Sequence, residues 1–211
     1  MDTRVADQLR LHSGHLDFIG RSHIWIDDYD RADSVRFAQF ALANALAHTA
    51  PGQLEVLVFD DALRGIAAPF QEVNSGGEKI LRHINDVQEL NETIKYLHEH
   101  ARSVLNVIQG RTESLLDFRR QLSPKVEGFK LVVLSTIYDL LSDEIRDKLT
   151  VLLKAGPAAG VTFLIHSMKL KVNEEILNLT QLCDVEERMV YGDDGAVRGQ
   201  FDPQSADDLI S

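Results

Sequence analysis

Cysteine and long hydrophobic runs are scarce in this sequence, and each shortage excludes a class of protein. Among 211 residues there is one cysteine, Cys183, so the chain cannot form an internal disulfide or supply the several thiolates of a structural zinc site. No apolar stretch approaches the roughly 18 residues of a membrane-spanning helix, and the first ten residues contain no apolar core of a secretory leader. We therefore expect a cytoplasmic protein without a membrane partner.

Positive charge is also in short supply. The chain has 22 Lys and Arg against 33 Asp and Glu, which gives a net charge of −11. Such a surface repels the phosphate backbone of nucleic acid unless its cations gather on one face. The densest basic spots, Arg119-Arg120 and Lys169 with Lys171, form no basic stripe. We therefore expect no direct binding of duplex DNA by this segment alone, and a protein partner is favoured.

Strand-like and helix-like segments alternate along the chain. Apolar runs typical of buried parallel strands occur at 23–26, 54–59, 129–134 and 161–165. Helical patterns lie at 34–48, 86–108, 112–122, 142–156 and 172–181. This order predicts an α/β fold with a mostly parallel sheet and helices on both faces. We expect the four runs to lie parallel in one sheet, with 130–135 next to 23–26.

Two weaker strand patterns and the chain ends complete the predicted organisation. Short strands are expected within 79–84 and at 187–191. We divide the chain into a lead-in at 1–22, one domain at 23–192 and an acidic tail at 193–211.

The turn after the first predicted strand lacks the residues that hold phosphate. A phosphate-binding loop needs glycines, which let backbone N–H groups approach the oxygens, and a lysine that neutralises their charge. Residues 27–33 read Asp-Asp-Tyr-Asp-Arg-Ala-Asp, and their four aspartates and one arginine give a local charge of −3. Clustered carboxylates can hold Mg²⁺ or Ca²⁺, but aspartates before a helix more often cap it and interact with its dipole. We favour capping and predict no metal site.

Several segments together resemble the FtsK/SpoIIIE family of motor ATPases, a branch of the RecA-like P-loop NTPase fold. The resemblance covers about residues 20–192 and follows the family's order of strands and helices. It rests on the strand His23-Ile24-Trp25-Ile26, the run PGQLEVLVFD at 51–60, the long helix and its continuation at 86–120, the strand LVVLST at 131–136 and the segment AAGVTFLIHSM at 158–168.

The resemblance also implies where a nucleotide site would lie, and this chain departs from the family there. The loop lysine falls on Asp33 or Ser34, with Asp28 in the same loop. The two acids that orient Mg²⁺ and activate water correspond to Ser135 and Thr136, and hydroxyls are poor general bases at neutral pH. The glutamine that senses the γ-phosphate corresponds to Met168, whose thioether is a weak hydrogen-bonding group. These six positions are interpreted as vestigial, with no catalytic residue and no cofactor.

Those departures predict a catalytically inactive FtsK/SpoIIIE-like module, a pseudo-ATPase. We expect it to serve as a structural or regulatory part of a DNA-translocating or secretion motor assembly, with active motor ATPase subunits or itself as partner. Two alternatives stay open. One is an atypical ATPase that binds ATP and Mg²⁺ through Arg31 or Lys130. The other is an α/β protein-binding module unrelated to the family.

The eight histidines suggest no metal centre. His12 and His15 lack a third ligand nearby, and His98 and His100 point to different sides of a helix. His166, at the end of a predicted strand, is interpreted as a hydrogen-bonded core histidine and not as a catalytic base, because no serine or cysteine nucleophile signature adjoins it.

Overall fold

The computed structural model describes most of the predicted domain. The described residues are 18–27, 32–50, 52–70, 80–122, 128–171, 173–183, 190–191 and 197–198. The first part of the lead-in, most of the loop at 27–33 and most of the acidic tail lie outside the described residues.

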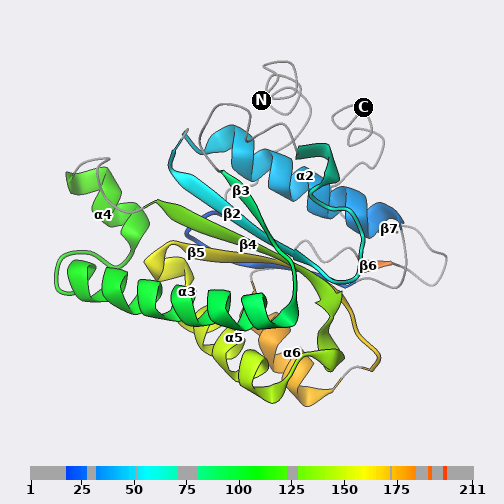
Figure 1. Ribbon diagram of the computed structural model, residues 1–211. Coiled ribbons are helices and arrows are strands. Elements are labelled where there is room, and N and C mark those ends of the chain that lie inside the picture. Colours follow the sequence, from blue (N-terminus) through cyan, green and yellow to red (C-terminus); the bar gives the residue numbers. More distant parts are fainter. Residues whose placement is uncertain are drawn as a thin grey trace.

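A five-stranded sheet, in which every neighbouring pair is parallel, forms the centre of the molecule (Figure 1). The parallel arrangement of the four long apolar runs is therefore confirmed, and the weaker pattern at 79–84 forms a fifth strand. Its strands are β1 (Ile24–Asp27), β2 (Leu54–Asp60), β3 (Leu81–Ile84), β4 (Phe129–Ile137) and β5 (Val161–Met168).

The order of the strands corrects one prediction. The sheet runs β1-β5-β4-β2-β3, so β5 lies between β1 and β4, and 130–135 is not next to 23–26. The two longest apolar strands, β4 with 9 residues and β5 with 8, pair with each other in the middle. The strands of 4 residues, β1 and β3, are left at the edges, where fewer ladder hydrogen bonds are needed.

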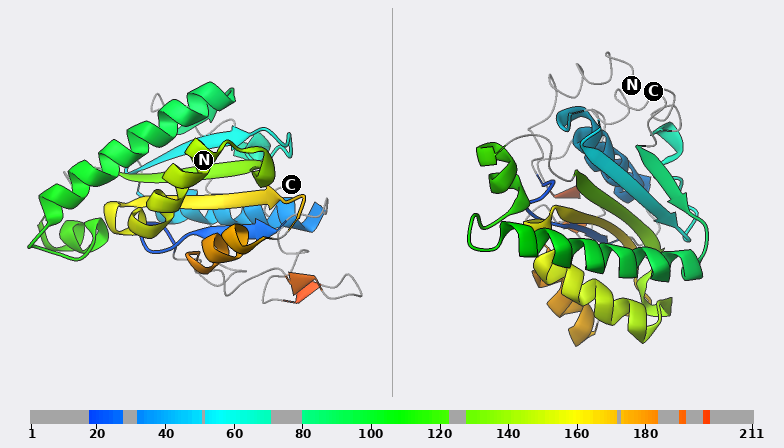
Figure 2. Two further views of the ribbon diagram at one scale, coloured as in Figure 1. Left: turned by 90° about the horizontal axis from the view of Figure 1, so that it is seen from below. Right: turned by 60° about the vertical axis from the view of Figure 1, so that its left-hand side comes forward.

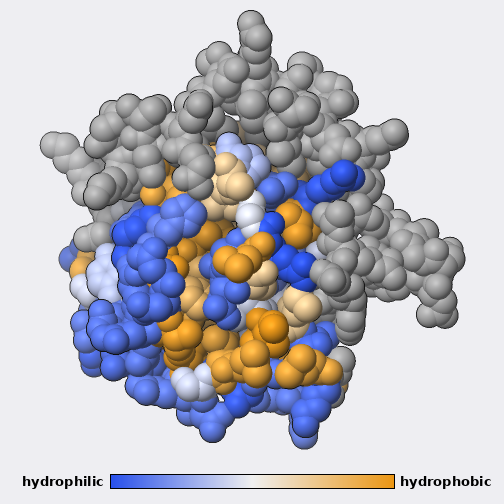
Figure 3. All heavy atoms as spheres, turned by 45° about the vertical axis from the view of Figure 1, so that its right-hand side comes forward, coloured by the Kyte–Doolittle hydropathy of each residue, from blue (hydrophilic) through white to orange (hydrophobic). Residues whose placement is uncertain are grey.

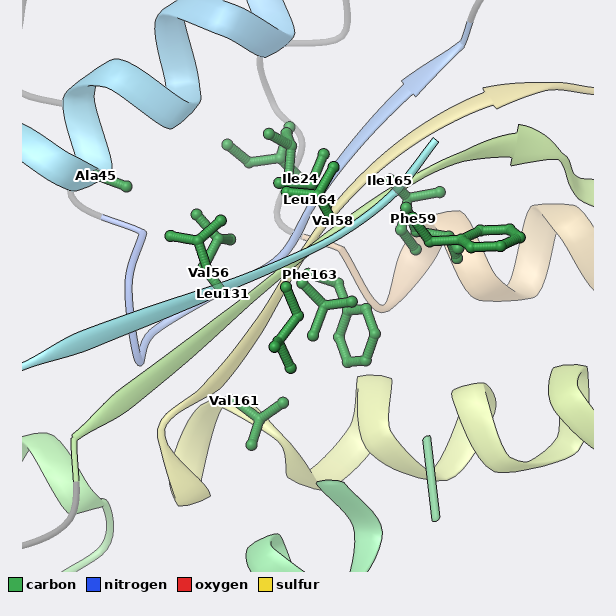
Figure 4. Packing of buried hydrophobic residues seen from close by; sticks show 14 of the residues in the cluster. Ile24, Ala45, Val56, Val58, Phe59, Leu131, Val161, Phe163, Leu164 and Ile165 are labelled. Carbon is green, nitrogen blue, oxygen red and sulfur yellow. The ribbon is translucent and has the colours of Figure 1, made fainter. Parts of the chain in front are cut away.

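Helices cover both faces of the sheet, as predicted. Figures 1 and 2 show α2 on one face and α3 with α5 on the other. In Figure 4, Ile24 and Leu164 point to the α2 side of the sheet, and Val161 and Phe163 point to the opposite side. This alternation along β5 buries both faces of the strand. The helices are α2 (Ala32–His48), α3 (Val87–Ile108), α4 (Leu115–Leu122), α5 (Asp143–Ala155) and α6 (Glu174–Gln181).

Polar residues begin three of these helices. Asp86, Ser142 and Asn173 each accept a hydrogen bond from the backbone N–H three residues later, which satisfies a donor that the first helical turn leaves unpaired.

Two short strands, β6 (Val190–Tyr191) and β7 (Val197–Arg198), pair antiparallel in a separate sheet. No helix within the described residues is long and apolar enough to cross a bilayer.

Asn44 is a polar residue in the most deeply buried part of α2. Its side chain has no exposed surface, and neither its Oδ1 nor its Nδ2 has a hydrogen-bond partner in the part of the chain that the structure describes. An unpaired buried polar group costs about 1 to 3 kcal/mol. Leucine branches at Cγ as asparagine does and carries no polar atom, so it removes that cost, and its larger methyl groups have to pack among the neighbouring side chains.

We therefore expect Asn44→Leu to raise the free energy of unfolding by about 1 to 3 kcal/mol. Urea denaturation of the variant and the wild type measures the difference. The matched control is Asn44→Asp, which keeps the shape, adds a buried charge and is expected to lower the free energy of unfolding. A destabilised Asn44→Leu variant would contradict the prediction, because it would mean that the carboxamide makes hydrogen bonds in solution or that the larger side chain does not fit.

Candidate functional site

The carboxyl ends of the parallel strands meet at one edge of the sheet, which is where α/β folds usually bind ligands. There the register aligns Ile26 of β1, His166 of β5, Ser135 of β4 and Asp60 of β2 in one row. Because paired residues of parallel strands project to the same face, this row lies on one side of the sheet. The hydrogen bond of His166 to α2 identifies that side as the α2 face.

A buried hydrogen-bonded network occupies this edge. The Oγ of Ser34, in the first turn of α2, lies 3.0 Å from His166 Nε2. The Oγ of Ser135 lies 3.3 Å from His166 Nδ1. All three residues are fully buried. A neutral imidazole has one donor and one acceptor nitrogen, and hydroxyl hydrogens rotate to suit, so one serine donates to the ring and the other accepts from it. The ring is therefore satisfied by the protein itself.

The network revises the interpretation of His166 in one respect. Ser167, the next residue in the sequence, projects to the opposite face of the sheet, yet the structure brings two other serines within hydrogen-bonding distance, one of them 132 positions away. A serine and a histidine at 3.0 Å have the spacing of a nucleophile and its base. Since none of the three side chains is exposed, a substrate has no access to them, and the interpretation as a hydrogen-bonded core histidine holds.

Of the six positions interpreted as vestigial, the structure brings two together and places Thr136 on the opposite face of the sheet. Ser34 and Ser135 share His166, whereas Thr136 pairs in register with Ser167 and so points to the opposite face of the sheet. Met168 receives a contact from the guanidinium of Arg64. Asp33 lies in the first turn of α2, and Asp28 lies outside the described residues.

Asp60 is a residue of this edge that the sequence reasoning did not single out. Its carboxylate accepts hydrogen bonds from the backbone N–H groups of Arg64, at 2.9 Å, and Gly65, at 2.7 Å. Its carbonyl accepts from the N–H of Leu63 at 3.1 Å. Asp60 therefore holds the loop after β2, and an aspartate four or five residues before a glycine in a strand-to-loop segment is the signal that could have indicated this role.

Lys130, considered above as an unorthodox nucleotide ligand, lies at the other end of the sheet. It is the second residue of β4, and its Nζ is 2.6 Å from Glu55 Oε2 on the neighbouring strand. Ser135 lies five positions further along the strand, a distance of about 17 Å. The cation therefore cannot reach the carboxyl edge while it pairs with Glu55. Arg31 lies outside the described residues.

The described side chains at this edge offer no unengaged ligand for Mg²⁺ or ATP. The hydroxyls of Ser34 and Ser135 could contact a hydrated metal, but both are bonded to His166. The oxygens of Asp60 are bonded to its own loop. Among the described residues, no three His, Cys, Asp or Glu side chains are grouped closely enough to hold a metal ion.

Two hollows of about 290 and 300 Å³ lie away from this edge. Both are lined by Gln53 and Phe129, which stand at the amino ends of β2 and β4. They are thus at the opposite end of the sheet from Ser135 and His166, and they contribute nothing to the network.

Comparison with known proteins identifies the fold. No protein-family model and no curated protein matches the sequence. The structure is similar to that of EssC (ATPases 2 and 3) from Geobacillus thermodenitrificans, with 13% identity, a TM-score of 0.59 and coverage of 90% of this chain and 42% of that one. It is also similar to the cytoplasmic domain of EssC (13% identity, TM-score 0.62, 90% and 43%) and to the pCW3 conjugation coupling protein TcpA with ATPgS (12%, 0.55, 77% and 52%).

These likenesses support the fold predicted from sequence. The chain has the parallel α/β architecture of P-loop motor ATPase domains. It spans about half or less of the length of these relatives.

Proposed function

From the fold that this chain shares with EssC and TcpA, we propose that it is a catalytically inactive ATPase-like module. The module does not bind ATP or Mg²⁺, and it has a structural or regulatory role in a motor assembly for secretion or DNA translocation. Its partners are active ATPase subunits or further copies of itself.

The observation that carries the proposal is the buried network at the carboxyl edge. Ser34, His166 and Ser135 satisfy one another and have no exposed surface, so ATP would have to break an internal network before it could bind. Hydrolysis also needs groups that position water and neutralise developing charge, and hydroxyls at 135 and 136 perform neither task well.

The likeness to EssC (ATPases 2 and 3) supports the proposed role in an assembly. EssC is described as containing ATPases 2 and 3, and this chain matches 42% of that structure, a share that suits a single ATPase domain. We therefore propose that the domain functions beside others of the same fold, and that its role depends on its surfaces.

Titration with ATP and Mg²⁺ tests the proposal. A ligand at 100 times its dissociation constant adds about 2.7 kcal/mol of stability. For a domain of this size such a gain raises the melting temperature by about 5 to 10 °C. We expect no shift at millimolar nucleotide and no heat of binding by calorimetry.

The Asn44→Leu variant is the internal control, because its expected stabilisation is of similar size and demonstrates that the assay resolves such a shift. Saturable binding of ATP with release of phosphate would overturn the proposal and favour the atypical ATPase.

A further inference from the structure

Three leucines project from the carboxyl edge of the sheet into solvent. Leu63 is 89% exposed, Leu140 is 67% exposed and Leu170 is 68% exposed. They follow β2, β4 and β5 respectively, so each stands just beyond the end of a neighbouring strand. Figure 3, which brings this side of the molecule forward, shows hydrophobic residues at the surface among hydrophilic ones. We name Leu63, Leu140 and Leu170 the leucine edge.

Hydrogen bonds tie the loop after β5 to the loop after β4. Asp139 Oδ2 accepts from the backbone N–H of Leu170, at 2.8 Å, and of Lys171, at 3.0 Å. Asp139 directly precedes Leu140, so this carboxylate holds two members of the leucine edge close together.

The loop after β2 joins the same surface. The N–H of Ala62 donates to the carbonyl of Ser135 at 3.3 Å, and the Arg64 guanidinium contacts Met168 Sδ. Leu63 lies between these two attachment points. The three loops that carry the leucines are therefore joined to one another at this edge.

The backbone of Leu63 is unusual as well. Its φ is 53°, a left-handed value that glycine adopts readily and a leucine adopts with strain. Three hydrogen bonds to Asp60, from the N–H groups of residues 63, 64 and 65, hold it there. An exposed leucine gains nothing from burial in the isolated chain, and strained residues cluster at functional sites. The loop therefore presents an apolar side chain at a cost to folding.

We propose that the leucine edge binds a second copy of this chain in a two-fold symmetric contact. Such a contact places the same surface on both sides, so that surface must be complementary to itself. Exposed Lys171 follows Leu170, and exposed Glu174 begins the next helix, in which Glu175 already pairs with Arg146 at 3.5 Å. Both charge signs therefore border one apolar centre, as in a typical interface with a polar rim, and cations of one copy face carboxylates of the other. The inference rests on the proposed function in one respect, namely that nucleotide does not compete for this edge.

The test compares the mass of the full chain in solution, by sedimentation over a wide range of concentrations, with that of two variants. Leu63→Gly removes the side chain and relieves the strained φ, so it is expected to fold at least as well as the wild type. Burying a leucine is worth roughly a factor of ten or more in an equilibrium, so we expect its dimer dissociation constant to rise at least tenfold. The control is Val107→Ala, because Val107 is also exposed but lies at the far end of α3.

We expect a wild-type dimer, an unchanged dimer for Val107→Ala and a weakened one for Leu63→Gly. A chain that is monomeric at every concentration overturns the inference, and so does a dimer that Leu63→Gly does not weaken. Titration of the same samples with ATP and Mg²⁺ separates the two proposals. Nucleotide binding with dimerisation intact overturns only the inactive-module proposal, and a monomer that ignores nucleotide overturns only the leucine-edge contact.

Discussion

Replacing His166 with alanine is expected to lower the free energy of unfolding by about 4 kcal/mol. The change deletes a fully buried ring from the carboxyl edge and leaves a cavity. It also removes the hydrogen-bond partner of the Ser34 and Ser135 hydroxyls, both of which are buried. The loss of packing and the loss of hydrogen bonds act in the same direction. Urea denaturation, with folding checked by circular dichroism, measures the effect.

A double-mutant cycle with Ser135→Ala separates the two contributions. If the hydroxyl and the ring are coupled, the double variant loses less stability than the sum of the single variants. If His166→Ala lowers the free energy of unfolding by less than about 1 kcal/mol, our interpretation is contradicted, because losses of that size are typical of solvent-exposed substitutions. Such a result would mean that the edge is open to water and has room for a ligand, which would weaken the case for an inactive site.

The second large effect that we expect is on the pH dependence of stability, and it depends on His23 at the amino end of β1. Its Nδ1 accepts a hydrogen bond from the N–H of Phe163 at 2.9 Å, and its Nε2 donates to the carbonyl of Leu153 at 3.0 Å. The acceptor role of Nδ1 requires a neutral ring. Burial lowers the pKa of His23 from 6.5 to about 4, and the bond to Leu153 opposes this shift.

We therefore expect acid to destabilise the protein through His23. Because its folded-state pKa lies below the unfolded value, the unfolded chain binds the proton first, and stability is lost as the pH falls from 6.5 towards 4. The shift corresponds to about 3 kcal/mol over this window. Urea denaturation at a series of pH values measures the slope.

In His23→Asn the ionisable ring is absent, so the variant is expected to be less stable at pH 7 but to lose less stability between pH 6.5 and 4. His83→Asn, at an exposed histidine of β3, is the control for the removal of a surface imidazole. If His23→Asn and the wild type lose the same stability over this window, the ring is not buried in its neutral form.

The sequence by itself determined the fold class. Continuous apolar runs such as LEVLVF at 54–59 and VTFLI at 161–165 can be buried on both faces only in a parallel sheet covered by helices. The helix after Asp86 was equally predictable, because its cap and its apolar spacing are local features. The resemblance to motor ATPases followed from the same runs, since their order along the chain is what the fold preserves.

Only the tertiary structure decided the order of the strands and the contents of the carboxyl edge. The position of β5 between β1 and β4 depends on pairing among segments more than 100 residues apart, as with Trp25 and Ile165, which the sequence does not encode locally. His166 joins Ser34 and Ser135 because strand register and a helix packed over it bring distant residues to one point. The leucine edge likewise exists only because three loops end side by side. Local propensity acts over a few residues, whereas sites form from side chains that packing gathers from the whole chain.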